Sequence, residues 1–270
     1  MPYIILSGCA FAALLIARAA LGMTWLPAGP EVARAQTIGK RQINADVFEW
    51  SARGSAVLLV LADGIGTGAK GRAAALAAAD SAVRTFELQG ASNPAYFFRL
   101  AFHNANEAVL RYVPDGTAGA NLLCVLVTEG LLYYALAGNC RVSVFRKSEL
   151  IPLSEGQTLD ALAGSAFRKR AISREEALSV HGTRRVYNYA GRDGFKEPET
   201  SDIPVRLKTG DCVVLTTDGV YEFCPAPDLE RILKTGRSCR RKADAVIDLL
   251  ERRGDPQQDN ATVVLARFGR

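Results

Sequence analysis

Two long helical patterns, at 71–89 and 94–112, follow each other directly, with strand-like runs on both sides. Runs rich in branched and aromatic residues are typical of strands. They lie at 45–50, 56–62, 121–128, 131–137, 141–146, 211–217 and 261–268, and a third helical pattern covers 239–253. Runs of strands and a pair of helices, without regular alternation, predict an α+β fold with antiparallel sheets. The same order excludes a doubly wound parallel sheet.

A glycine-rich turn stands before the first of these helical patterns. Gly66-Thr67-Gly68-Ala69-Lys70-Gly71 satisfies G-x-G-x-x-G, the pattern of a dinucleotide-binding loop. Such a unit needs a second parallel strand soon after its helix, but a second helical pattern occupies that place. A phosphate-binding P-loop is excluded too, since Lys70 is followed by glycine. The turn therefore matches the residue pattern of a dinucleotide-binding loop but lacks the second parallel strand that such a unit requires after its helix.

Composition narrows the class of protein. The 270 residues, 49% apolar and 23% charged, fit one catalytic-size globular domain. A net charge of +5, from 33 basic and 28 acidic residues, is too mild and dispersed to predict a nucleic-acid partner. Six cysteines without C-x-x-C spacing, mostly in apolar runs, favour buried free thiols over disulfides. Because the chain has only two histidines, any catalytic metal is expected to have oxygen ligands.

Residues 3–26 form an apolar run broken only by Arg18, about the ~20 residues that a membrane helix requires. Basic residues follow the run and none precedes it, which predicts that the rest of the chain is cytoplasmic. We therefore expect a single-pass helix in the cell membrane within 1–26, a linker over 27–36 and one catalytic domain over 37–270.

Three other interpretations of this segment stay open. Ala33-Arg34-Ala35 resembles a signal-peptidase site, although no charged region precedes the apolar run. Leu6-Ser7-Gly8-Cys9 resembles a lipoprotein box, although only five residues come before it. The run is also compatible with a buried or surface helix of a cytoplasmic protein.

Three aspartates stand at the ends of strand-like runs. Asp63 and Asp218 each end an apolar run and precede glycine, and Asp259 comes just before the last run. Each alone is better explained by a turn, because Asp-Gly is a common turn dipeptide. Carboxylates at buried strand ends are costly to desolvate, and a divalent cation is the natural partner for several together. Together they predict a divalent-cation site at a sheet edge.

Five motifs in a fixed order resemble those of the metal-dependent protein phosphatases of the protein phosphatase 2C (PPM) type, as found among bacterial Ser/Thr phosphatases. They are TIGKRQINAD (37–46), ADGIGTGAKG (62–71), AGNCR (137–141), LKTGDCVVLTTDGVYE (207–222) and DNAT (259–262). The resemblance runs from about Thr37 to Phe268. It implies a sandwich of two antiparallel β-sheets flanked by antiparallel helix pairs, with a two-metal site at one edge.

The resemblance also implies roles for individual residues. Asp63 would bridge two Mn²⁺ or Mg²⁺ ions. Asp218 and Asp259 would complete the first metal site, and the Gly64 carbonyl would help hold the second. Arg41 stands at the family's phosphate-binding arginine, and Asp46 would orient the nucleophilic water. The polar region 154–206, with a capping box from Ser173 to Glu176, is interpreted as a partly helical flap over one edge of the sheets. A surface insertion with no catalytic role explains it equally well.

The implied activity is hydrolysis of phosphoserine and phosphothreonine by a water that two metal ions activate. Its substrates would be phosphorylated proteins, the products of a Ser/Thr kinase, with no nucleic-acid partner. A related branch, which controls sporulation and stress sigma factors, also carries glycine-rich turns of this kind. The presence of Arg41 together with the N-x-D motif at 44–46 favours the first branch.

Four positions depart from the family pattern. Ala45 replaces a glutamate that serves the second metal, which is expected to weaken that site. Asn139 replaces an aspartate and Glu222 stands where another acid is usual, which argues against a third metal. Ile65 occupies a position that is methionine in many bacterial members and histidine in some others. These departures leave one alternative: a pseudophosphatase that binds a phosphoprotein and regulates it with little or no hydrolysis.

Overall fold

The computed structural model describes residues 29–182, 185–201 and 203–268. The expected hydrophobic helix within 1–26 lies outside these residues. Within the described ranges, no helix has both the length and the apolar character needed to cross a membrane.

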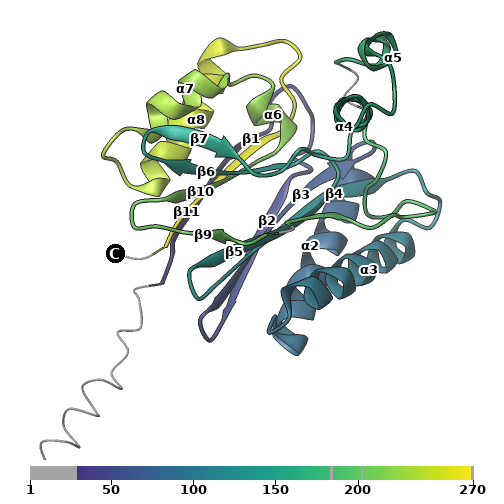
Figure 1. The fold of residues 1–270 in the computed structure, drawn as a ribbon, viewed down its shortest axis with the longest axis horizontal. Helices are drawn as coiled ribbons and strands as arrows, with labels where there is room; N and C mark the ends of the chain where they lie inside the picture. Colours follow the sequence, from purple (N-terminus) through teal and green to yellow (C-terminus); the bar gives the residue numbers. More distant parts are fainter. Residues whose placement is uncertain (1–28, 183–184, 202, 269–270) are drawn as a thin grey trace, which may run out of the picture.

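The fold is a sandwich of two sheets (Figure 1), and every paired strand is antiparallel to its neighbour. The first sheet has the order β1 (Glu31–Thr37), β11 (Ala261–Arg267), β10 (Cys212–Thr216), β6 (Arg141–Arg146), β7 (Glu149–Pro152). The second has the order β2 (Val47–Arg53), β3 (Ala56–Ile65), β4 (Gly119–Thr128), β5 (Leu131–Ala137), β8 (Glu199–Thr200). Strand β9 (Val205–Arg206) pairs with β5 off this path.

Helices cover the two outer faces. The pair α2 (Ala69–Gln89) and α3 (Pro94–Tyr112) packs on the second sheet, and α7 (Ala226–Leu233) and α8 (Cys239–Arg253) pack on the first. A third apolar cluster, including Leu59, Leu123 and Leu215, fills the space between the sheets. The predicted sandwich with flanking helix pairs is therefore confirmed.

The helix pair that excluded a dinucleotide fold has clear local causes. Alanines on α2 are fully buried against α3 and the second sheet, so the two helices approach closely. Helix α3 begins with Pro94, and the Asn93 side chain accepts a hydrogen bond from the Tyr96 N–H, which caps its first turn. Both helices therefore form where the sequence predicts them.

The glycine-rich turn serves close packing. A Cβ on Gly64 would lie 2.3 Å from the carbonyl oxygen of Gly71, so the end of β3 touches the first turn of α2. Only glycine permits this approach. The motif thus places Asp63 directly beside the start of a helix.

Residues 31–36, expected to be linker, form β1 instead. The strand pairs with β11 from Glu31↔Arg267 to Thr37↔Ala261 and lies beside α8. Apolar and polar side chains alternate only weakly along this strand, because the residues at its inward positions, Ala33 and Ala35, are small. The sequence pattern therefore did not predict a strand here.

Two further expectations are confirmed. The five cysteines in the described part of the chain are free and buried. The region 154–206 contains two short helices, α4 (Leu159–Arg168) and α5 (Arg174–Ser179), and the predicted capping box between Ser173 and Glu176 starts α5. We call residues 154–206 the flap.

Candidate active site

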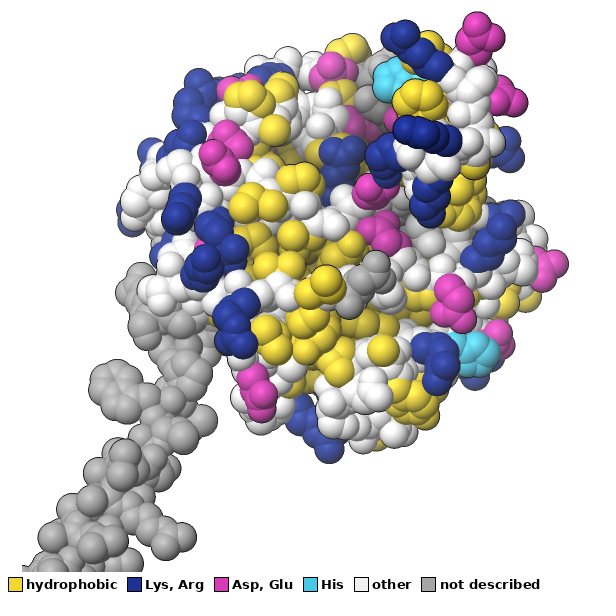
Figure 2. All heavy atoms as spheres, viewed as in Figure 1, with side chains coloured by type: hydrophobic (Ala, Val, Ile, Leu, Met, Phe, Trp, Pro, Cys, Tyr) yellow, Lys and Arg dark blue, Asp and Glu magenta, His cyan; other side chains and the backbone are white. Residues whose placement is uncertain are grey.

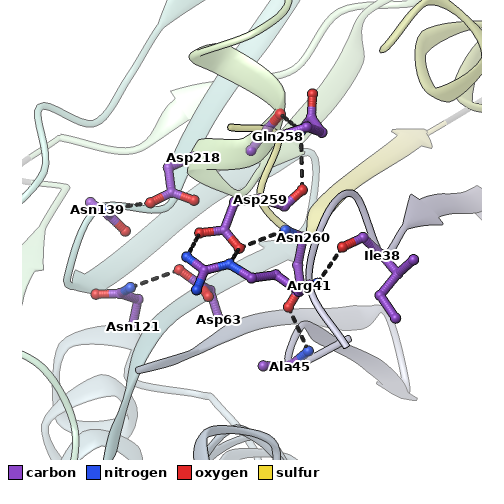
Figure 3. Close-up of polar contacts among 11 residues, drawn as sticks. Ile38, Arg41, Ala45, Asp63, Asn121, Asn139, Asp218, Gln258, Asp259 and Asn260 are labelled. Atoms are coloured by element: carbon purple, nitrogen blue, oxygen red, sulfur yellow. Dashed lines mark hydrogen bonds and ion pairs between the residues drawn. The ribbon is translucent and has the colours of Figure 1, made fainter. Parts of the chain in front are cut away.

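The three predicted aspartates come from both sheets and meet at one cavity. Asp63 lies near the end of β3 in the second sheet, Asp218 opens the short helix α6 (Asp218–Tyr221) after β10, and Asp259 precedes β11 in the first sheet. All three line a cavity of about 720 Å³, together with Gly64 and Arg41. Figure 3 shows the carboxylates of Asp63, Asp218 and Asp259 pointing towards a common space.

Arg41 is paired with Asp259. Its Nε lies 2.7 Å from Asp259 Oδ1 and its Nη2 lies 2.5 Å from Oδ2, a bidentate ion pair. The hydrogen bond to Asp259 raises the pKa of Arg41 further. The expected phosphate-binding arginine and an expected metal ligand thus neutralise each other. Among the described residues, no three His, Cys, Asp or Glu side chains are assembled as a metal cage.

Two asparagines fix the other two carboxylates. Asn121 donates from Nδ2 to Asp63 Oδ2 at 2.8 Å, and Asn139 donates from Nδ2 to Asp218 Oδ2 at 3.0 Å. Sequence reasoning missed Asn121. The available signal was a polar residue near the start of the apolar run ANLLCVLV, which the β3–β4 register places opposite Asp63. Asn139, noted as a departure, acts here as a neutral donor.

Asp46 is buried and does not line the cavity, only 1% of the residue being exposed. Its Oδ2 accepts a hydrogen bond from the Thr217 hydroxyl at 3.0 Å, and its carbonyl oxygen accepts one from Arg72 Nη1 at 2.7 Å. Burial raises the pKa of Asp46 to about 6, and the charges of Asp218 and Asp259 add to this rise. Asp46 is therefore held behind the carboxylates that face the cavity.

Ala45 lines the cavity, and its N–H donates to Asn260 Oδ1 at 2.8 Å. Asn260 in turn donates from Nδ2 to the carbonyl oxygen of Ile38 at 2.9 Å. These bonds tie the loop that carries Arg41 to the segment that carries Asp259. The backbone at position 45 is thus held in place although the family's glutamate side chain is missing.

Buried carboxylates crowd together in the interior of the site. Burial raises the pKa of Asp63 well above its usual range, and Asp218 and Asp46 raise it further. The Oδ1 atoms of Asp46, Asn121 and Asn139 are buried and lack a hydrogen-bond partner in the described part of the chain. Crowded carboxylates and unpaired oxygens are the donor set that Mg²⁺ and Mn²⁺ prefer. The residues present therefore fit the divalent ions that the sequence predicts.

Comparison with known proteins tests the resemblance that the motifs predict. No family model matches the chain. It is 26% identical over 234 residues to "Serine/threonine phosphatase stp" of Listeria welshimeri, covering 82% of this chain and 88% of that one. The structure of the S. agalactiae serine/threonine phosphatase matches with a TM-score of 0.77 at 20% identity, over 88% of this chain and 99% of that one. The resemblance to the metal-dependent protein phosphatases is confirmed.

A second solved structure bears on the metals. The catalytic domain of the PPM-type phosphatase PstP, solved in complex with two manganese ions, matches with a TM-score of 0.72 at 23% identity. The match covers 89% of this chain and 99% of that one. At 23% identity this match shows that the two chains share a fold.

Proposed function

We propose that this chain is a Mn²⁺- or Mg²⁺-dependent protein-serine/threonine phosphatase. One observation carries the proposal: Asp63, Asp218 and Asp259 meet in one cavity with Arg41, in a chain with the PPM fold. Relatives named Ser/Thr phosphatases, and a PPM structure with two manganese ions, support both the activity and the cofactor. The comparisons give no support to the pseudophosphatase alternative, which rests on the departures at Ala45 and Asn139.

In this proposal Asp63, Asp218, Asp259 and the Gly64 carbonyl hold the metal ions. Two divalent ions at such a site supply an activated water and neutralise charge on the phosphoryl group. Asn121 and Asn139 orient the carboxylates of Asp63 and Asp218. The bidentate fork of Arg41 exchanges Asp259 for two phosphoryl oxygens, a geometry that lysine cannot reproduce.

Asp46 and Ile65 set the proton handling. The resemblance assigns Asp46 to orienting the attacking water, and its one unpaired carboxylate oxygen is the group available for this from behind the cavity wall. Ile65 lines the cavity and has no proton to give. In this chain the leaving alkoxide therefore takes its proton from solvent.

The substrates proposed are phosphoproteins, the products of a Ser/Thr kinase. We also propose that residues 3–26 anchor the domain in the cell membrane with the active site on the cytoplasmic side. This rests on the apolar run and on the basic residues that follow it, Arg34, Lys40 and Arg41.

The test is hydrolysis of a small aryl phosphate by the full-length chain, with Mn²⁺ and Mg²⁺ titrated separately. We expect turnover that depends on the metal and that Asp63→Asn and Asp218→Asn each abolish. Asp248→Asn, an exposed position on α8 outside the cavity, is the matched control and should retain full activity. A folded protein that binds Mn²⁺ yet hydrolyses nothing would instead establish the pseudophosphatase alternative.

Position 45 gives a second test of the same proposal. Restoring the family's side chain with Ala45→Glu should raise turnover at low Mn²⁺, because it returns an acid to the cavity wall. Ala45→Gln adds the same bulk without the charge and should not. Equal rates for all three proteins would contradict a weakened second metal site.

A further inference from the structure

The rim of the active-site cavity carries two basic side chains that have no assigned role. Lys40 and Arg185 both line it, and both are exposed. Neither side chain makes a hydrogen bond or ion pair with the part of the chain that the structure describes. Arg41, by contrast, is taken up by Asp259. Two cations at the mouth of a catalytic cavity are thus available to a ligand.

Arg185 belongs to the flap but is tied to the catalytic core. Its carbonyl oxygen accepts a hydrogen bond from the Leu159 N–H at 2.9 Å, and the Tyr187 N–H donates to the Gln157 carbonyl at 3.0 Å. The Gln157 N–H in turn donates to the Gly138 carbonyl at 2.6 Å. Gly138 directly precedes Asn139, which holds Asp218. Backbone hydrogen bonds therefore fix the position of Arg185 relative to the carboxylates.

The backbone of Lys40 is held by the segment that leads into β11 of the first sheet. Its N–H donates to the Gln258 carbonyl at 2.8 Å, next to Asp259. Gly39 packs so closely here that a Cβ would lie 2.4 Å from the Asp259 carbonyl oxygen. Lys40 thus comes from the Arg41 loop and Arg185 from the flap, at separate parts of the cavity wall.

The charges of the cavity indicate what these cations are for. Its lining contains three basic side chains, Lys40, Arg41 and Arg185, and three acidic ones, Asp63, Asp218 and Asp259. These charges balance before any metal binds, so bound divalent ions leave a positive surplus. A phosphomonoester dianion offsets only part of it. Figure 2 shows Lys and Arg side chains over the flap helices α4 and α5, with Asp and Glu side chains among them.

We propose that Arg185, assisted by Lys40, selects phosphoproteins with a second negative group next to the phosphorylated residue. This inference rests on the proposed function and names its substrate class. The second group is an acidic side chain or another phosphate, and Arg185 binds either as a bidentate fork. Arg185 is a specificity residue: it contacts the flanking group, while Arg41 contacts the phosphate being removed.

The test compares three phosphothreonine peptides of equal length on the full-length chain with Mn²⁺. One has glutamates beside the phosphothreonine, one has a neighbouring second phosphothreonine, and one has glutamines. We expect kcat/KM for both acidic peptides to exceed that of the glutamine peptide by about three- to fivefold, as befits exposed ion pairs. A gain for the doubly phosphorylated peptide alone would identify phosphate as the second group.

Arg185→Ala should remove most of this preference and leave the glutamine peptide and the aryl phosphate unchanged. Lys40→Ala should reduce the preference by a smaller factor. The matched control is Arg174→Ala, an exposed flap arginine outside the cavity lining, which should keep the full preference. A wild-type chain without preference, or a preference that survives in Arg185→Ala, would overturn the inference.

Binding separates this inference from the proposed function. Fluorescence anisotropy with labelled peptides and the inactive Asp63→Asn variant should show the same acidic preference, lost with Arg185→Ala and weakened by salt. If Asp63→Asn does not fold, the wild-type chain in EDTA replaces it. Acid-selective binding without turnover would refute the phosphatase and leave Arg185 as the selective residue. Turnover without acid-selective binding would support the phosphatase and refute Arg185 as the selective residue.

Discussion

The Arg41 guanidinium has two possible anionic partners, the Asp259 carboxylate and a phosphoryl group, and it cannot bind both at once. In this structure its fork holds Asp259, whereas in catalysis it is proposed to hold a phosphoryl group. Asp259 in turn must leave Arg41 to bind metal. At the scale of single residues, metal binding and phosphate binding are therefore coupled through one ion pair.

The coupling predicts that Arg41→Ala binds Mn²⁺ more tightly while it loses activity. Removing the guanidinium frees Asp259 and removes a nearby positive charge, and both effects favour a cation. Because the pair is largely exposed, the gain should be modest, about fivefold or less. Isothermal titration with Mn²⁺ measures it, and kcat/KM for an aryl phosphate should fall by about 100-fold.

Arg41→Lys is the matched control, because it keeps the charge and loses the fork. Its Mn²⁺ affinity should lie close to wild type while its kcat/KM still falls. Unchanged Mn²⁺ affinity in Arg41→Ala would show that the ion pair does not compete with the metal.

Residue types at strand ends indicated three acids that a sheet edge could bring together, and Asp63, Asp218 and Asp259 do line one cavity. Two site features were not predictable in the same way. The pairing of Arg41 with Asp259 joins residues 218 positions apart, and depends on how two loops approach. The contact between Asn121 and Asp63 depends on the β3–β4 register, which no motif specifies.

The turn after β5 governs one of these contacts. Gly138 has a φ of +117°, and a Cβ there would lie 2.2 Å from Asn121 Oδ1. Gly138→Ala should therefore displace Asn121 from Asp63 as well as strain the backbone. We expect a loss of about 2–3 kcal/mol in the free energy of unfolding, measured by urea denaturation, and weaker Mn²⁺ binding.

Gly130→Ala is the control for backbone strain alone. Gly130 also has a positive φ, +74°, but a Cβ would meet nothing within 4 Å. It should cost about 1 kcal/mol and leave Mn²⁺ affinity unchanged. Equal effects of the two substitutions on metal binding would rule out a role for the Gly138–Asn121 contact.

A buried ion pair holds the opposite end of the first sheet. Arg146, at the end of β6, donates to Asp211 with Nη2–Oδ2 and Nε–Oδ1 distances of 2.5 Å and 2.9 Å, and only 4% of Asp211 is exposed. Burial by itself raises the pKa of Asp211. The hydrogen bonds from Arg146 and from the Lys208 N–H outweigh it, so the pKa is lowered overall.

Asp211→Asn should lower the free energy of unfolding by about 2 kcal/mol at pH 7. A lowered pKa means that the stabilisation is present above the unfolded value of about 3.9 and is lost as pH falls below it. Urea midpoints of variant and wild type should therefore stay apart from pH 7 to about pH 4 and draw together only as the pH falls further. Asp80→Asn, which breaks the exposed Arg84 pair, should cost less than about 0.5 kcal/mol throughout.

At the scale of elements, the long helices and the inner strands follow the apolar patterns, because burial fixes their periodicity. The strands that the sequence did not predict lie at the edges of the sheets. Strand β1 carries small alanines on its inward face, and β8 and β9 have two residues each. Such strands form because a neighbouring strand offers unpaired backbone groups, which is a property of the sheet and not of their own sequence.

For the whole molecule, metal should govern stability. In EDTA, Asp63→Asn should melt higher than wild type, because it removes a buried charge among other carboxylates. Mn²⁺ at about 100 times its Kd should add about 2.7 kcal/mol to wild type, roughly 5–10 °C in Tm, and much less to the variant. A wild type indifferent to Mn²⁺ would contradict the proposed metal site.

The sign of the pH effect follows. Because the pKa of Asp63 is raised in the folded state, folded protein takes up this proton before unfolded protein does. Metal-free wild type should therefore gain stability relative to Asp63→Asn as pH falls from 7 towards 5. Differential scanning fluorimetry of both proteins in EDTA measures the narrowing gap.

Asp63 comes from one sheet, and Asp218 and Asp259 come from the other. Both sheets contribute residues to the site, so the rate of hydrolysis depends on the position of one sheet relative to the other. A small shift of one sheet against the other would abolish hydrolysis even if every strand and helix stayed folded. Substitutions in the inter-sheet layer, at positions such as Leu59 and Leu215, can thus switch activity off far from any ligand.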